Sequence, residues 1–153
     1  MGKRIEGRDW LLLLIAAGDG QKSIDPVRVM KGAFILTKEL AARGESEPYE
    51  FIPYHYGPCA PDVYGDLDSL AAEGLIVVDA TPPRKWPVYR ATMSGTQRAK
   101  AVAEELDEIW TDYIPRLRAW LDRQTFDSLL RTVYKLYPEY ASKTLLPDLA
   151  KQL

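Results

Sequence analysis

Residues 49–74, YEFIPYHYGPCAPDVYGDLDSLAAEG, constrain the fold more than any other part of the chain. Residues 49–54 are aromatic and β-favouring, which predicts a strand, and Pro53 restricts that strand to the edge of a sheet. Residues 56–58 (Tyr-Gly-Pro) predict a tight turn, because glycine relieves the backbone and proline fixes φ after it. A helix that ends at a glycine is expected to follow over residues 61–74. The rest of the chain must therefore be arranged around a strand–turn–helix unit.

Two helices are expected before this unit. Residues 8–17 carry leucine and isoleucine on almost all sides, which predicts a helix that is buried on most faces. Asp25 and Pro26 are a natural N-cap and first-turn residue for the second helix, and Gly44 is its stop. Gly32 inside that helix costs roughly 1 kcal/mol relative to alanine, so we expect another helix to cross closely there.

A hairpin is expected after the unit. Residues 75–78 and 88–92 read as two short strands, and the prolines of residues 81–87 confine that segment to the hairpin tip. The expected order is therefore three helices followed by a strand, a basic loop and a second strand. This is the order of elements in a winged helix-turn-helix. The sequence therefore predicts a winged-helix core over residues 5–93.

The C-terminal part, residues 94–153, is expected to be helical. Ser94 and Gln97 have the spacing of a capping box, which predicts a long helix with a kink or restart at Pro115. A further helix is expected over residues 125–137. We predict that these helices pack on the winged-helix core as one structural unit, so the fold class is α+β and mainly helical.

The composition excludes several classes of protein. The chain has a formal net charge of −2, one cysteine and one histidine, so it has no internal disulfide and too few ligands for a structural zinc site. The apolar run at residues 10–17 is too short to span a membrane. We expect a cytoplasmic protein with no metal, no cofactor and no membrane partner.

The helix expected at residues 61–74 is acidic. Its apolar side is formed by Val63, Leu67, Leu70 and Ala71, whereas Asp62, Asp66, Ser69 and Glu73 lie opposite, with Asp68 on the flank. The segment contains no lysine or arginine, and DNA binding depends largely on such residues neutralising phosphates. We therefore predict that Asp62, Asp66 and Glu73 contact a protein partner with basic character rather than the major groove.

The hairpin tip has the opposite charge. Arg84, Lys85 and Trp86, with Arg90 nearby, form a compact basic and aromatic group that suits phosphate or minor-groove contacts. The alternative is a solubilising tip with Trp86 folded onto the core. A second group of basic residues is interspersed with aspartates and is expected to be a solvated helix face: Arg116, Arg118, Arg123, Arg131 and Lys135.

Two groups of tyrosines admit two interpretations. Tyr49, Tyr54, Tyr56 and Tyr64 suit either a binding interface or the shell of a small core, and we assign Tyr56 and Tyr64 to the partner-binding surface. The tyrosines at positions 134, 137 and 140 raise the same question. If the two groups pack together, the C-terminal helices close over the turn.

His55 and Cys59 lie close to two aspartates in the sequence. One histidine and one cysteine are not enough for structural zinc, and a nucleophilic Cys–His pair would need a third orienting group. We therefore expect no catalytic residues.

Three segments carry a family resemblance: MKGAFIL at residues 30–36, FIPYHYGPCAPDVYGDLDSLAAEGLI at residues 51–76 and VYKLYPEYASKTLL at residues 133–146. Together they resemble the YwgA-like proteins, which are similar to the Panacea-domain proteins. The resemblance implies a winged-helix-like fold in a small prokaryotic or phage protein, and some Panacea members act as antitoxins. It implies no catalytic residues. Cys59 departs from the bulkier or hydroxyl residue expected after Gly-Pro.

The sequence thus predicts a non-enzymatic regulatory module that binds a protein, either antitoxin-like or an accessory to a defence system. The alternative is a winged-helix transcriptional regulator that holds DNA through Arg84, Lys85 and Arg90 and forms a homodimer through a C-terminal helix. A third possibility is a small-molecule sensor with a pocket between the two layers, which no sequence feature selects.

Overall fold

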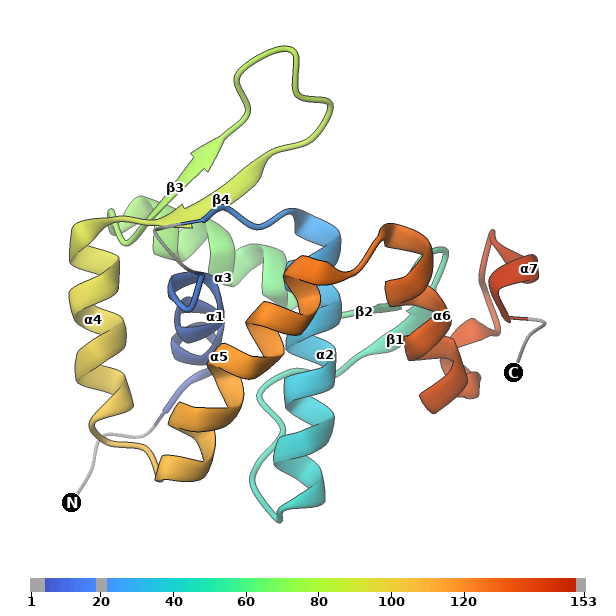
Figure 1. The fold of residues 1–153 in the computed structure, drawn as a ribbon, viewed down its shortest axis with the longest axis horizontal. Coiled ribbons are helices and arrows are strands. Elements are labelled where there is room, and N and C mark those ends of the chain that lie inside the picture. Colours follow the sequence, from blue (N-terminus) through green and yellow to red (C-terminus); the bar gives the residue numbers. More distant parts are fainter. Residues whose placement is uncertain (1–4, 19–21, 151–153) are drawn as a thin grey trace.

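A computed structural model describes residues 5–18 and 22–150 of the chain (Figure 1). The described part is α+β and mainly helical, with two small antiparallel sheets of two strands each. In chain order, its elements are α1 (Gly7–Ala16), α2 (Pro26–Ala42), β1 (Ile52–Tyr54), β2 (Gly57–Cys59), α3 (Pro61–Ala72), β3 (Ile76–Asp79), β4 (Val88–Ala91), α4 (Met93–Ala103), α5 (Glu108–Arg123), α6 (Phe126–Leu136), the 3-10 helix η2 (Pro138–Ala141) and α7 (Pro147–Ala150).

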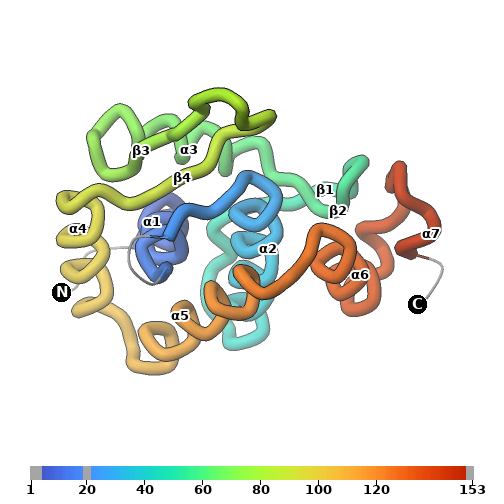
Figure 2. The backbone as a smooth tube through the Cα atoms, turned by 45° about the horizontal axis from the view of Figure 1, so that its top comes forward, coloured from blue at the N-terminus to red at the C-terminus, as the bar shows by residue number. Residues whose placement is uncertain are grey.

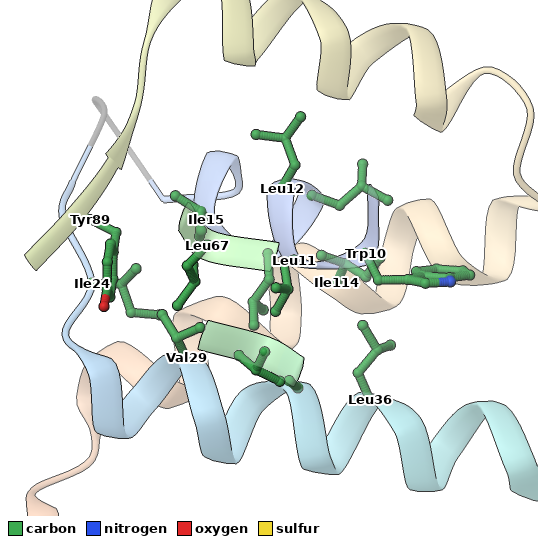
Figure 3. Packing of buried hydrophobic residues seen from close by; sticks show 14 of the residues in the cluster. Trp10, Leu11, Leu12, Ile15, Ile24, Val29, Leu36, Leu67, Tyr89 and Ile114 are labelled. Atoms are coloured by element: carbon green, nitrogen blue, oxygen red, sulfur yellow. The ribbon is translucent and has the colours of Figure 1, made fainter. Parts of the chain in front are cut away.

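Helix α1 is the most enclosed element, as its composition predicts. Seven consecutive residues from Asp9 to Ile15 are buried, and α2, α3, α4 and α5 all contact the helix. The Asp9 carboxylate accepts a hydrogen bond from the Glu6 backbone N–H at 2.9 Å, which satisfies a donor at the helix start. Figure 3 shows side chains of α1 meeting those of α2, α3 and α5 in one cluster.

Helix α2 confirms its predicted start and its close crossing. Asp25 caps the helix by accepting a hydrogen bond from the Arg28 N–H at 2.9 Å, and Pro26 occupies the first turn. A Cβ at Gly32 would lie 2.7 Å from Leu121 Cδ1 and 2.8 Å from Leu14 Cδ2. Glycine is therefore needed where α2 packs against both α1 and α5.

The central stretch differs from the prediction in two respects. The strand expected over residues 49–54 is shorter, because only Ile52–Tyr54 pair with a neighbouring strand. The chain turns at positions 55 and 56, and Gly57 and Pro58, expected in the turn, instead begin β2, which pairs with β1. Gly57 has φ = 90°, a conformation that residues with a side chain rarely adopt, so it can close this short hairpin. Pro53 faces Pro58 across the pair, as suits a proline-containing strand that has only one neighbour.

The second hairpin forms as predicted. Strands β3 and β4 pair with Ile76 opposite Ala91, and the connection projects as a long loop from the rest of the molecule (Figure 1). Ile24, just before α2, exchanges two backbone hydrogen bonds with Tyr89 of β4, at 2.8 and 2.9 Å. This bridge ties the α1–α2 connection to the hairpin.

The C-terminal helices depart from prediction in their cap and their break. Thr92, not Ser94, caps α4, because its hydroxyl accepts a hydrogen bond from the Gly95 N–H at 3.0 Å. The predicted single long helix is two helices, α4 and α5, separated at residues 104–107, and Pro115 lies inside α5 without restarting it. Three-and-four spacing from Val102 and Leu106 predicts that Ile109 is buried, but the break changes the buried face: Ile109 is 40% exposed and Trp110 is buried.

The last described residues close over the first hairpin. The Leu145 N–H donates a hydrogen bond to the His55 carbonyl at 2.9 Å, and the Tyr134 hydroxyl donates to the Thr144 hydroxyl at 2.8 Å. Figure 2 shows β1 and β2 between α2 on one side and α6 with α7 on the other.

One hydrophobic cluster includes residues from both sides of position 94, among them Leu11, Val29, Ile114 and Leu121 (Figure 3). The two predicted parts therefore share buried contacts. Over the described ranges, none of the helices combines the length and apolar character needed to cross a bilayer.

Candidate partner-binding site

Exposed aromatic and aliphatic side chains gather at the β1–β2 hairpin and the first turns of α3. Ile52, Tyr54, Tyr56 and Tyr64 each expose between 46% and 51% of their surface. They surround a cavity of about 380 Å³ between the hairpin, α2 and the start of α3. The lining of this cavity is mostly apolar or aromatic and comprises Pro26, Val27, Met30, Lys31, Ile52, Tyr54, Tyr56, Gly57, Cys59, Pro61 and Tyr64. We call the four exposed side chains the tyrosine surface and the hollow below them the Lys31 pocket.

The buried lysine of this pocket is the main residue that the sequence did not single out. Its charge alone predicts that Lys31 lies on the solvent-facing side of α2, but only 4% of its surface is exposed. Its ammonium group donates a hydrogen bond to the Pro58 carbonyl at 3.1 Å, which links α2 to β2. Burial lowers the pKa of Lys31 to about 8, and nearby Cys59 shifts this pKa in the opposite direction.

A sequence signal for this burial exists. Lys31 follows Val27 by four positions and precedes Phe34 by three, so it lies on the same face of α2 as those apolar residues. The charge of Lys31 predicts an exposed side chain, whereas its spacing from these apolar residues predicts a buried one.

The acidic residues of α3 fall into two groups. The Tyr49 hydroxyl donates a hydrogen bond to the Asp66 carboxylate at 2.5 Å. Glu73 forms an ion pair with Arg8, which also donates to the Ser69 hydroxyl at 2.7 Å. Two of the three predicted partner-binding carboxylates therefore already have partners within the chain.

The remaining carboxylates of α3, Asp62 and Asp68, lie on its exposed surface. Asp62 is adjacent in sequence to Pro61, a lining residue of the Lys31 pocket, and two positions from Tyr64. The structure thus brings Asp62, Tyr56 and Tyr64 to one region, whereas Asp66 and Glu73 lie further along the helix.

A second hollow, of about 600 Å³, is strongly acidic. Its lining includes the side chains of Trp10 and Trp110, whose ring centroids are 5.9 Å apart. Five acidic residues also line it: Glu6, Glu45, Glu47, Glu105 and Asp107. Gly7, another lining residue, lies against Tyr49, the partner of Asp66. The acidic character of α3 therefore continues onto the neighbouring surface.

The tip of the second hairpin exposes its aromatic residue. Trp86 has 60% of its surface exposed, so the interpretation in which it folds onto the core is wrong. Arg84 forms an ion pair with Asp79 at 3.5 Å, which neutralises part of the basic group. Lys85 and Arg90 are exposed.

The second basic group is not a uniformly solvated face. Arg118 is 1% exposed and donates hydrogen bonds to the carbonyls of Leu14 and Ile15 at the end of α1, at 3.0 and 2.7 Å. It also pairs with Asp122 at 3.0 Å. By contrast, Arg116 is 71% exposed and pairs with Asp112 on the same helix. Arg118 is thus a structural residue.

The two tyrosine groups have different environments. Tyr49 and Tyr134 are buried, whereas Tyr54 stacks on His55 with their ring centroids 4.3 Å apart. Tyr137 and Tyr140 contact the ring of Phe34 on α2. Among the C-terminal tyrosines, Tyr134 is buried and the other two are half-buried against Phe34, whereas those of the tyrosine surface face solvent.

No grouping of three or more histidine, cysteine, aspartate or glutamate side chains suitable for a metal ion is found in the described ranges. Cys59 is a free cysteine, and burial raises the pKa of its thiol, while Lys31 opposes this shift. A raised pKa disfavours the reactive thiolate.

No protein-family model matches the chain, and no curated protein matches it significantly.

Proposed function

We propose that the chain is a non-enzymatic regulatory module that binds a basic segment of another protein through its tyrosine surface. The observation that carries this proposal is the grouping of Ile52, Tyr54, Tyr56 and Tyr64, all about half-exposed, around one hollow. Tyrosines combine a large apolar area with a polar tip and are enriched at the centres of protein interfaces.

Charge supports a basic partner. Asp62 and Asp68 lie exposed on α3, and a second, acidic hollow adjoins the region of Tyr49 and Asp66. Five acidic residues line that hollow, so its charge suits a lysine or arginine side chain of a partner. Complementary charge of this kind mainly increases the rate of association and the specificity of the complex.

A winged-helix core is the arrangement that we propose for α1, α2, α3 and the β3–β4 hairpin. Its support is the order of these elements and the isolated backbone bridge from Ile24 to Tyr89, which joins the residues before α2 to β4. The β1–β2 hairpin would then be an insertion between the second and third helices. The antitoxin-like or defence-associated role rests on the resemblance to the YwgA-like and Panacea-domain proteins.

The test is a binding measurement with a partner captured from the native host and then purified. Tyr64→Ala and Asp62→Lys should each weaken the affinity at least about tenfold, since truncated interface anchors cost upwards of 1 kcal/mol. Asp112→Lys is the matched control, because Asp112 is exposed on α5 and forms an ion pair with Arg116 on the same helix. Unchanged affinity in both test variants would contradict the proposal.

The alternative function is DNA binding through the β3–β4 hairpin. The exposed Trp86 at the hairpin tip, with exposed Lys85 next to it in sequence and exposed Arg90 on β4, favours this function. Binding of duplex DNA should then fall steeply with salt and weaken in the double variant Lys85→Gln, Arg90→Gln. Failure to shift duplex DNA at low ionic strength would remove this alternative.

A further inference from the structure

The Lys31 pocket contains a buried cation without an acidic partner. Lys31 forms no ion pair within the described part of the chain, and its ammonium group donates a hydrogen bond to the neutral carbonyl of Pro58. The described residues that line the pocket include no aspartate or glutamate. A buried charge is costly unless it is paired, so this site lacks the counter-charge that proteins usually supply.

The remainder of the pocket suits an apolar body attached to an anionic group. Val27, Met30 and Ile52 contribute aliphatic surface, and Tyr54 and Tyr64 contribute aromatic rings. The volume of about 380 Å³ falls within the range of small-molecule sites. Such sites combine apolar walls with a few polar groups that fix the orientation of the ligand.

We propose that this pocket binds a small organic carboxylate, with the carboxylate on the Lys31 ammonium group and the apolar part between the tyrosines. An ammonium group has three N–H donors, and the Pro58 carbonyl accepts from one of them. The others are available to carboxylate oxygens, which form stronger hydrogen bonds with a charged donor than neutral oxygens do. The inference concerns the cavity beneath the tyrosine surface and stands whether or not a protein docks there.

The ligand class follows from the geometry. A phosphate or sulfate would place two charges and several polar oxygens against mostly apolar walls with one cation, whereas a monocarboxylate carries one charge and leaves its body apolar. Aromatic and medium-length aliphatic acids therefore fit better than inorganic anions. A neutral isostere such as the amide would leave the buried charge unpaired.

The experiment is an NMR titration of the full chain with lysine side chains labelled. The probes are phenylacetate and hexanoate, each compared with its primary amide, and inorganic phosphate. Both carboxylates should move the Lys31 side-chain resonances saturably at millimolar concentration or below. The amides should bind at least about tenfold more weakly, which is the lower end of what a hydrogen bond to a charged group contributes.

Two variants separate charge from structure. Lys31→Met keeps the length and apolar stem of the side chain and should abolish the preference for acid over amide. Lys38→Met is the control, because Lys38 also lies on α2 but packs over the rings of Phe34, Tyr137 and Tyr140. Its variant should keep the preference.

The comparison of acid with amide in the unmodified protein needs no variant, so misfolding of Lys31→Met would not leave the proposal untested. Tyr64→Ala removes a ring from the pocket wall and should weaken the binding of each acid and of its amide by a similar factor. Absence of a saturable Lys31 shift with either acid, or equal binding of acid and amide, would overturn the proposal. So would tighter binding of phosphate than of the organic acids.

Discussion

The guanidinium group of buried Arg118 donates a hydrogen bond of 2.7 Å to the carbonyl oxygen of Ile15. The same group donates to the carbonyls of Leu14, Lys22 and Ser23, so one α5 side chain holds carbonyls at the end of α1 and in the α1–α2 connection. Carbonyls at a helix C-terminus have no partner within the helix, and the terminus carries partial negative charge. A buried arginine satisfies both needs.

Loss of this arginine should destabilise the fold strongly. We expect Arg118→Met to lower the free energy of unfolding by about 3–5 kcal/mol, because the Asp122 carboxylate and several carbonyls lose their donor. Urea denaturation measures this change. Arg116→Met, two positions away and exposed, should change stability by less than about 1 kcal/mol. Equal effects of the two substitutions would contradict the structural role of Arg118.

A side chain at Gly95 should disrupt the packing of α4. A Cβ there would lie 1.9 Å from the Leu75 carbonyl oxygen, a backbone atom that cannot move aside cheaply. We expect Gly95→Ala to cost about 3 kcal/mol or more by overpacking. Gly65→Ala is the matched helical control, since no atom lies within 4 Å of its added Cβ, and it should stabilise α3 by up to about 1 kcal/mol. Thermal unfolding of both variants distinguishes these signs.

The hydrogen bond from Tyr49 to Asp66 should contribute to stability rather than to partner binding. We expect Tyr49→Phe to lower the free energy of unfolding by about 1.5–3 kcal/mol, the range for hydrogen bonds to charged groups. Burial, with the Asp66 hydrogen bond, raises the pKa of Tyr49, so its neutral form persists in the folded state. This contribution is fully present below the ordinary tyrosine pKa and is lost only at higher pH.

Tyr64→Phe provides the comparison, because Tyr64 lies half-exposed on the tyrosine surface of the same region. It should leave the stability nearly unchanged. If Tyr49→Phe were equally neutral, Asp66 would return to the set of residues available to a partner. This is why Asp62, and not Asp66, is the position for charge reversal in the partner-binding test.

Lys31 should make stability depend on pH. Burial lowers its pKa from 10.5 to about 8, so between these values the unfolded chain binds a proton that the folded chain releases. Stability contributed by Lys31 therefore rises as the pH increases from about 8 to about 10.5, by about 3 kcal/mol in total. Below pH 8 the buried charge is destabilising.

The measurement is the difference in unfolding free energy between the unmodified protein and Lys31→Met across this pH range. The titratable groups near Lys31 are Cys59 and the tyrosines at 54, 56, 64 and 134. Because Lys31 itself lowers the pKa of the Cys59 thiol, both proteins carry Cys59→Ser, so that the difference reports on Lys31. We expect Lys31→Met to lose its relative advantage as the pH rises. A difference that does not vary with pH would mean that Lys31 is well solvated.

Local sequence patterns were enough to predict most helices and strands. Asp25 with Pro26 starts α2, and Gly74, with φ = 74°, follows α3, as their sequence patterns indicate. The β3–β4 hairpin and its proline-rich tip also follow from the pattern. The site was predictable in part: Tyr56, Tyr64 and Asp62 lie in one region, as assigned.

Other features required contacts between distant segments. The break at residues 104–107 was hidden because the apolar spacing continues through it, and it shifts the buried face of α5 from Ile109 to Trp110. The sequence alone shows no partner for Asp66 or Glu73, because Tyr49 and Arg8 come close to them only in the folded chain. Neither partner can be inferred from helix periodicity.

Caps, turns, helix stops and apolar faces are thus properties that this sequence determines by itself, because they depend on backbone preference and on side chains within a few positions. The tertiary structure decided which charged and aromatic side chains are buried and which are exposed. Lys31 and Arg118 are buried and Trp86 is exposed because packing partners far away in sequence set the cost of removing each group from water. That same long-range packing placed an unpaired cation beneath the tyrosine surface.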